Sequence, residues 1–431
     1  MREDGGLACL WRSKRIGVRA TIAFLCLFFT VVAKTGATGR TIDFHPANVP
    51  AAATSKKTVE QTEQMSWDNT GKQEVRVGLF LKQRTMLVSS DKGFSLIDEK
   101  SGKVLSNIAP NSAIKLEEKQ GGILLDGKLL LTESFRLVPK TKAGIFMLGT
   151  KHYHGMMMVR LHGTSFDIIN IVELEDYVNG VLPEEMPSSW PAEALKAQAV
   201  AARTYGLRNR LRHKTEDYSV CATTHCQIYG GIDVETAATR EAVAATSGEV
   251  LFYANKPAEA LFHSDSGGMT ESSEAVWGNA VPYLLPVKED VLGTGAWQQT
   301  FSEERIAEKL AGKGVSIGRL KKIELSPLVI GKGRGDRSVS GRVLRVVFYG
   351  AQGSITLTGS EVRSLFGLKS TLFDIRWEKK FDGKGQVIIS GFGNGHGIGL
   401  SQYGAKNLAK RMKYTDILAH YYPGTTLRRL K

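Results

Sequence analysis

Residues 192–202 read AEALKAQAVAA, and this alanine-rich stretch restricts the possible folds of the chain more than any other feature. Alanine has the highest helix propensity, so the stretch predicts an α-helix. Pro187 and Pro191 oppose a regular helix just before it, which leaves Ser188 or Ser189 as the expected N-cap. Because side chains this small let neighbouring elements approach closely, we expect the helix to be central and buried.

The rest of the chain mixes strand and helix patterns. Short apolar runs separated by turn residues predict an antiparallel β region over residues 74–165. From 166 to 431 strands and helices are interspersed, with helices expected at LEDYVNGVL, GSEVRSLFGL, GLSQYGAKNLAKRMK and YTDILAHYY. Thr415 can cap the last of these helices. Because there is no regular βαβ rhythm, the predicted fold class is α+β.

The N-terminus has the layout of an export signal. Basic residues precede an apolar run from Ala20 to Ala33, and small residues follow it up to Ala37. The run is short for a membrane span, so residues 1–37 are expected to be a signal peptide, with an uncleaved signal anchor as the alternative. Residues 38–73 are polar and aperiodic, which predicts a flexible linker.

The charge of the chain indicates an anionic neighbourhood. The formal net charge is +14. Residues 1–37 hold six Lys/Arg and two Asp/Glu, a net +4, which leaves +10 for the remainder. An anionic lipid surface or an acidic cell-wall polymer fits this balance, whereas export argues against nucleic acid. We expect the protein in the periplasm or cell-wall space, with membrane contact only through its N-terminal segment.

Two of the four cysteines lie close to histidines. Cys9 and Cys26 fall in the expected signal, whereas Cys221 and Cys226 belong to the body of the protein. One hypothesis is a Cys221–Cys226 disulfide, which is common outside the cytoplasm. The other is a closed tetrahedral zinc site, with the four ligands His213, Cys221, His225 and Cys226.

Three further stretches resemble one known family. LEDYVNGVLPEEMPSSWPAEALKAQAVAARTY, CATTHCQIYGG and GNGHGIGLSQYGAKNLAKRMKYTDILAHYYPGT match, in order and spacing, the SpoIID/LytB family of stage II sporulation protein D. The resemblance covers about residues 74–430. It implies a lytic transglycosylase that acts on peptidoglycan glycan strands, and some members are thought to bind zinc. The sporulation enzyme of the family prefers glycan stripped of stem peptides, which implies cooperation with a cell-wall amidase.

The resemblance also assigns roles to residues. The family's catalytic glutamate precedes Met-Pro, which makes Glu185 the expected general acid/base, presented by a loop that Pro187 stiffens. Arg203 is expected to hold glycan or stabilise developing charge, or else to be a buried structural arginine. His396 is expected to contact substrate or orient Glu185, or else to be a packed histidine. Expected neighbours of the substrate are Ser264, Ser266, Tyr283, Gln402 and Tyr403.

Three other functions are weighed against this one. A non-catalytic wall-binding protein that enhances an N-acetylmuramoyl-L-alanine amidase belongs to the same family. A hydrolase that uses water would need a second carboxylate, for which Asp265 and Glu274 are the candidates. The string HSDSGG is similar to the nucleophile loop of trypsin-like proteases, but the matching His and Asp contexts are missing, which argues against a serine protease.

Overall fold

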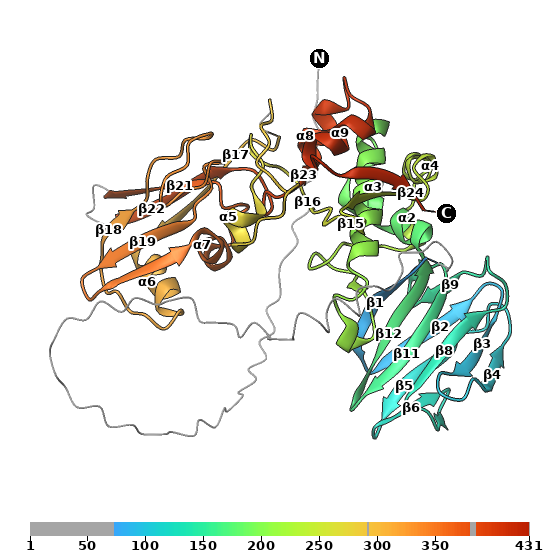
Figure 1. Ribbon diagram of the computed structural model, residues 1–431. Helices are drawn as coiled ribbons and strands as arrows, with labels where there is room; N and C mark the ends of the chain where they lie inside the picture. The colour runs from blue at the N-terminus through green and yellow to red at the C-terminus, as the bar shows by residue number, and fades with distance from the viewer. Residues whose placement is uncertain (1–72, 291–292, 380–384, 431) are drawn as a thin grey trace, which may run out of the picture. The chain divides into compact units, whose positions relative to one another are not determined.

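The computed structural model describes residues 73–290, 293–379 and 385–430 (Figure 1). The expected signal and all of the expected linker except Gln73 lie outside these ranges. The described residues all belong to one compact unit. Within the described residues, no helix combines the length and the apolar character that crossing a membrane requires.

Two antiparallel sheets form the N-terminal β region. The order of the seven-stranded sheet is β13 (Val220–Cys221), β1 (Glu74–Gln83), β12 (Ser165–Glu173), β11 (Met156–His162), β8 (Ser134–Pro139), β3 (Phe94–Asp98) and β4 (Val104–Ile108). The order of the six-stranded sheet is β10 (Lys151–Tyr153), β9 (Phe146–Leu148), β2 (Thr85–Ser90), β5 (Ile114–Lys119), β6 (Gly122–Leu125) and β7 (Lys128–Leu130). Strand β13 is the exception to the antiparallel pattern, since it pairs parallel to β1.

The core of this region lies between the two sheets. Apolar side chains that alternate along the strands meet there, as in the contact of Phe94 with Phe146, whose ring centroids are 5.2 Å apart. The region continues to Glu173, because β12 pairs with both β1 and β11.

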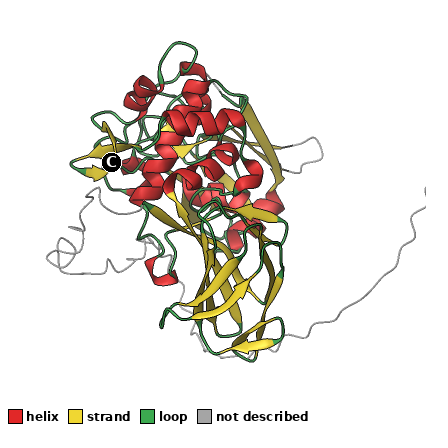
Figure 2. Cartoon of the chain, turned by 90° about the vertical axis from the view of Figure 1, so that its right-hand side faces the viewer, coloured by secondary structure: helices red, strands yellow, loops and turns green. Residues whose placement is uncertain are grey.

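A helical layer follows, and Figure 2 shows most helices gathered at one end of the long strands. Its helices are α2 (Leu174–Glu185), α3 (Ala192–Arg208), α4 (Ala237–Ala245), α8 (Gln402–Leu408) and α9 (Tyr414–Tyr421), with the short 3-10 turns η1 (Lys214–Glu216) and η2 (Ile232–Val234). Two small sheets accompany them, β15 (Lys256–Pro257) with β14 (Glu249–Tyr253) and β24 (Thr426–Arg429), and β16 (Phe262–His263) with β23 (Leu400–Ser401).

Helix α3 is central and buried, as the sequence predicts. Thirteen of its seventeen residues are buried. Its alanines contribute to two hydrophobic cores, one shared with the β region and one shared with α8 and α9. Close packing continues at Gly206, where an added Cβ would lie 2.9 Å from the ring of Tyr177 on α2.

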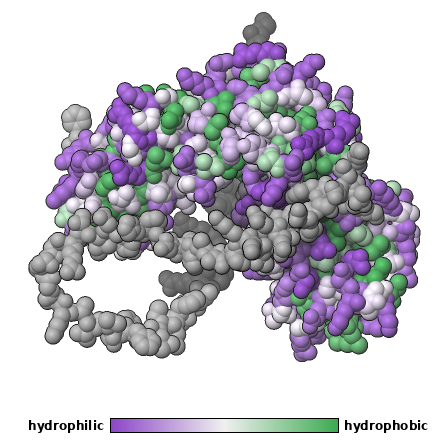
Figure 3. Space-filling view, in the orientation of Figure 1, coloured by the Kyte–Doolittle hydropathy of each residue, from purple (hydrophilic) through white to green (hydrophobic). Residues whose placement is uncertain are grey.

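A separate core occupies the segment between β16 and β23. Its two three-stranded sheets are β17 (Ala296–Ser302), β22 (Gly385–Phe392) and β21 (Phe373–Lys379), and β18 (Leu320–Glu324), β19 (Arg345–Gly350) and β20 (Ser354–Thr358). Helices α6 (Glu303–Ala311) and α7 (Gly359–Phe366) complete that core, and α5 (Ser273–Trp277) precedes it. Figure 3 shows apolar residues scattered among hydrophilic ones over the visible face.

The α+β class is confirmed, but two predicted caps are wrong. Pro191, not a serine, is the N-cap of α3, and its carbonyl accepts a bond from Ala194 N at 2.9 Å. Lys413 is the N-cap of α9, so Thr415 lies inside the helix. Neither helix has a side-chain cap, and packing against the rest of the protein stabilises both helices instead.

Candidate active site

Glu185 is the last residue of α2, not part of a loop. Helix α2 packs with Leu174, Tyr177, Val178 and Val181 buried on one face, as predicted, and it tolerates Pro183 in its last turn. The buried Met186 is its C-cap. The packed end of α2, and not a loop, therefore holds the Glu185 carboxylate rigidly.

Two hydrogen bonds and partial burial set the state of Glu185. The backbone N–H of Ile228 donates to its Oε1 at 3.0 Å, and the side chain of Gln402 makes a second hydrogen bond. Burial raises the pKa of Glu185 above its usual value, although both hydrogen bonds oppose the rise. Glu184, beside it, is exposed. Burial thus favours the protonated form of the half-buried Glu185 carboxyl, whereas the two hydrogen-bond donors favour its ionised form.

The segment that carries Ile228 is pressed against α2. Tyr177 donates to Gln227 Oε1 at 2.7 Å, and Gly230 N donates to Gly180 O at 2.9 Å. Glycine is required at position 180, because a Cβ there would lie 2.5 Å from the ring of Tyr229. The Ile228 N–H is therefore fixed by its neighbours on both sides.

The start of α8 is fixed equally firmly. Gln402 is its first residue and is 6% exposed. Ser401 caps the helix by accepting from Gly404 N at 3.2 Å. The half-buried carboxylate of Glu289 accepts hydrogen bonds from Ser401, Ser266 and Tyr421 at 3.2, 2.8 and 2.8 Å. This network joins segments that are far apart in sequence and positions Gln402 toward Glu185.

A group of half-buried side chains, Trp190, Tyr403 and Lys406, lies at the start of α8. Tyr403 follows Gln402, and its N–H donates to Ser264 O at 3.0 Å. Its ring meets Trp190 edge to face, with centroids 4.9 Å apart. The Lys406 ammonium lies 4.7 Å from the Trp190 ring centroid and 5.7 Å from that of Tyr403.

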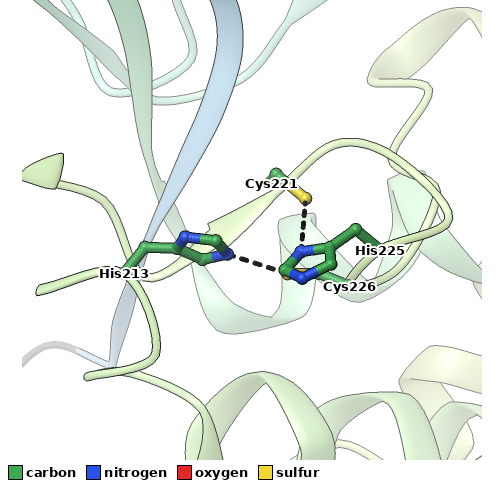
Figure 4. A group of neighbouring side chains, drawn as sticks. All are labelled: His213, Cys221, His225 and Cys226. Carbon is green, nitrogen blue, oxygen red and sulfur yellow. Dashed lines mark hydrogen bonds between the residues drawn. The ribbon is translucent and has the colours of Figure 1, made fainter. Parts of the chain in front are cut away.

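The two cysteines and two histidines that the sequence singles out lie together. Figure 4 shows their side chains pointing toward one another, and their ligand atoms all lie within 4.8 Å of one another. His213 Nε2 is 3.4 Å from Cys226 Sγ, and His225 Nδ1 is 3.6 Å from each sulfur. A tetrahedral zinc ion separates neighbouring N and S ligands by about 3.5 Å, so this donor set fits zinc.

The cluster is built on the edge of the large sheet. Cys221 lies on β13 opposite Gly78 of β1, and His213 stacks on Tyr218 with centroids 4.7 Å apart. Burial raises the pKa of Cys221, but hydrogen bonds from Thr223 and His225 outweigh it and lower the value to about 7. Both cysteines are free.

Arg203 has the contacts of a structural arginine, which was one of its two expected roles. Its side chain is 0% exposed and makes two 2.8 Å hydrogen bonds to the carboxylate of Glu175. A further bond runs to Glu249 O at 3.2 Å. Glu175 and Glu185 are ten residues apart on α2, about 15 Å along its axis. Arg203 therefore lies too far away to contact a group that reacts at Glu185.

Three other expected substrate contacts lie in the scaffold. Ser266 is 0% exposed and bonds Glu289, and Tyr283 is 6% exposed with its hydroxyl accepting from Glu259 N. His396 accepts from Ile398 N at 3.0 Å and bonds the backbone of Phe262, and burial lowers its pKa to about 4. His396 is thus a neutral, packed histidine.

Of the two candidates for a second carboxylate, Asp265 is engaged by internal hydrogen bonds and Glu274 lies on the surface. Asp265 is 0% exposed and accepts from Gly267 N at 3.0 Å and from Thr294 N and Oγ1, both at 2.6 Å. Glu274 is exposed on α5.

Sequence reasoning missed several groups around Glu185. The Ile228 donor is a backbone group, so no residue type could have identified it. No sequence pattern singles out Trp190, Lys406 and Glu289, and only the fold places them in this part of the protein. The sequence does single out Gln402 and Tyr403, and the structure places Gln402 against Glu185 with Tyr403 next to it in the chain.

Comparisons with known proteins match one named family and one domain of unknown function. The family described as stage II sporulation protein (SpoIID) matches residues 162–253, and a domain of unknown function (DUF8618) matches residues 279–399. Stage II sporulation protein D of Bacillus subtilis is 33% identical over 294 residues, which cover 62% of this chain and 78% of that protein.

Two other relatives are similarly distant. An uncharacterized protein of Brachyspira hyodysenteriae is 32% identical over 298 residues, 68% of this chain and 76% of that protein. The amidase enhancer of Bacillus subtilis is 34% identical over 291 residues, which cover 58% of this chain but 40% of the enhancer.

Proposed function

The chain belongs to the SpoIID/LytB family, and from this premise we propose that it is an exported peptidoglycan lytic transglycosylase. Glu185 is its single acid/base. The substrate is the glycan backbone, including strands that have lost their stem peptides, and the product carries a 1,6-anhydro-muramic acid end.

The reaction needs one carboxyl group in two states. Protonated Glu185 donates its proton to the glycosidic oxygen as the bond from C1 of the muramic acid to that oxygen breaks. The C6 hydroxyl of the same sugar then attacks C1 and closes the anhydro ring. Its proton returns to the Glu185 carboxylate, so the cycle consumes no water.

The observation that carries the proposal is the environment of Glu185. Burial raises its pKa, which favours the acid needed for the first step. The donors Ile228 N–H and Gln402 stabilise the carboxylate needed for the second. Asp265 is saturated by internal bonds, which favours a one-carboxylate mechanism over a two-carboxylate hydrolysis.

Zinc is proposed as a structural ion. His213, Cys221, His225 and Cys226 would hold it with four protein ligands, which leaves no open position for substrate. When bound, the ion would brace the loop that runs from Cys226 to Ile228.

The test is mass spectrometry of purified glycan after incubation with the protein. Intact and peptide-free peptidoglycan are compared, with Glu185→Gln as the inactive variant and Glu184→Gln as its matched neighbour. Anhydro-muramic ends that disappear only with Glu185→Gln are the expected result. New reducing ends would indicate a hydrolase and overturn the proposal.

The relative named amidase enhancer supports a second candidate, a non-catalytic enhancer of a cell-wall amidase. The same assay tests it. No cleavage of either glycan, together with retained glycan binding and a faster partner amidase, would replace the transglycosylase by the enhancer.

A further inference from the structure

A lysine and two aromatic rings form a small cluster near Gln402, whose side chain bonds the proposed acid. Trp190 belongs to the turn that follows α2, in which its N–H bonds Pro187 O at 3.0 Å. Tyr403 and Lys406 lie on α8. All three of Trp190, Tyr403 and Lys406 are half-buried, so each keeps a surface for a ligand. We call these three residues the aromatic-lysine cluster.

The charge of Lys406 is not neutralised within the described ranges 73–290, 293–379 and 385–430. No carboxylate there lies within 4 Å of its ammonium, which instead rests over the rings of Trp190 and Tyr403. Some other lysines and arginines of the helical layer do have acidic partners, such as Lys196 with Glu193 at 2.7 Å and Arg411 with Asp290 at 2.7 Å. A cation–π contact holds the ammonium in place but leaves its N–H donors available.

Lys406 lies about one helical turn along α8 from Gln402, whose side chain bonds the proposed acid. Lys406 follows Gln402 by four residues and Tyr403 by three, so all three project toward one side of α8. Four residues advance about 6 Å along a helix. Because Gln402 bonds Glu185, the backbone of Lys406 lies about 6 Å further along α8 than the residue that contacts the acid.

We propose that the aromatic-lysine cluster is a glycan subsite in which Lys406 pairs with the lactyl carboxylate of a muramic acid and Trp190 and Tyr403 flank the sugar. The assignment rests on the proposed function for its substrate. The chemistry is selective, since a free lactyl group ends in a carboxylate whereas a peptide-bearing one ends in a neutral amide. Lys406 is then a specificity-determining residue that reads the state of the muramic acid.

Binding is tested first, in the Glu185→Gln background, so that no cleavage is needed. Calorimetry compares peptide-free glycan oligosaccharides with the same oligosaccharides after their lactyl carboxylates are converted to amides. We expect amidation to weaken binding roughly tenfold, as for loss of a charge-assisted hydrogen bond. Adding Lys406→Met should weaken binding to the free acid by a similar factor and leave the amidated glycan unaffected.

Lys410→Met is the matched control, since Lys410 is an exposed lysine just beyond α8. It should preserve the discrimination between acid and amide. The proposal is overturned if Lys406→Met weakens both ligands equally, or if Lys410→Met abolishes the discrimination as well. Because binding is the readout, a protein without transglycosylase activity can still pass or fail this test.

Discussion

Replacing Arg203 by methionine should destabilise the protein without touching the chemistry at Glu185. The substitution removes both hydrogen bonds to Glu175 and leaves the carbonyl of Glu249 without this donor. Breaking a buried pair costs about 3–5 kcal/mol. The Glu175 side chain is 35% exposed and can be rehydrated, so we expect the lower end, about 3 kcal/mol.

Urea denaturation followed by circular dichroism measures the free energy of unfolding. Activity is measured on the folded fraction, at a temperature well below the transition. We expect kcat to stay within about threefold of the wild-type value, because Arg203 acts about 15 Å from the reacting groups along α2. Glu175→Gln should also destabilise, because it leaves the guanidinium buried without its counter-charge.

A double-mutant cycle separates the interaction free energy of Arg203 and Glu175 from other destabilising effects of the two substitutions. Arg203→Met and Glu175→Gln together should destabilise by less than the sum of the single effects, because the two side chains share one interaction. The structural argument is refuted if Arg203→Met unfolds like the wild type but loses about a hundredfold or more in kcat. That result would mean that Arg203 reaches the substrate.

Three further predictions concern groups around the proposed acid. Gln402→Leu removes a hydrogen bond that lowers the pKa of Glu185, so that pKa should rise and the alkaline limb of the kcat/KM profile should move to higher pH. An alkaline limb that does not move would contradict the contact between Gln402 and Glu185. Glu289→Ala leaves three hydroxyl donors unpaired and should lower the free energy of unfolding, measured by urea denaturation, by about 2–4 kcal/mol. Glu289→Gln should lower it by less, and equal losses for the two variants would argue against the hydrogen-bond network. Cys226→Ser should abolish the binding of about one zinc per chain, measured by elemental analysis, and lower the unfolding temperature; a wild-type protein with a disulfide and no zinc would refute the metal site.

The sequence predicts the central parts of this fold because they are encoded locally. Alanine density identifies α3, and helical periodicity identifies the buried face of α2 with Leu174 and Tyr177. The helix caps could not be predicted in the same way. Pro191 and Lys413 hold cap positions because packing fixes where each helix begins, which overrides the preference for serine or threonine.

The site is only partly encoded in short motifs. His225 and Cys226 are adjacent and Cys221 is near, so their proximity in space follows from their spacing, and zinc itself stays a prediction. By contrast, the contact of Trp190 with Tyr403 joins residues more than two hundred positions apart. No local pattern predicts such a pair. Arg203 is easy to single out in the sequence, but its role is not, because its partner Glu175 can be identified only from the fold.

The surroundings of Glu185 combine two opposing effects, and the proposed chemistry needs both. A carboxyl that was buried without donors would be a weaker acid, and it would give up its proton to the glycosidic oxygen less readily. Asp265 shows the other extreme, since it is buried but saturated by three donors and is suited to holding a loop. Glu185 lies between these cases, with burial favouring the acid while the Ile228 N–H and the Gln402 side chain favour the base. One group can then act in both halves of a cycle that uses no water and no second carboxylate.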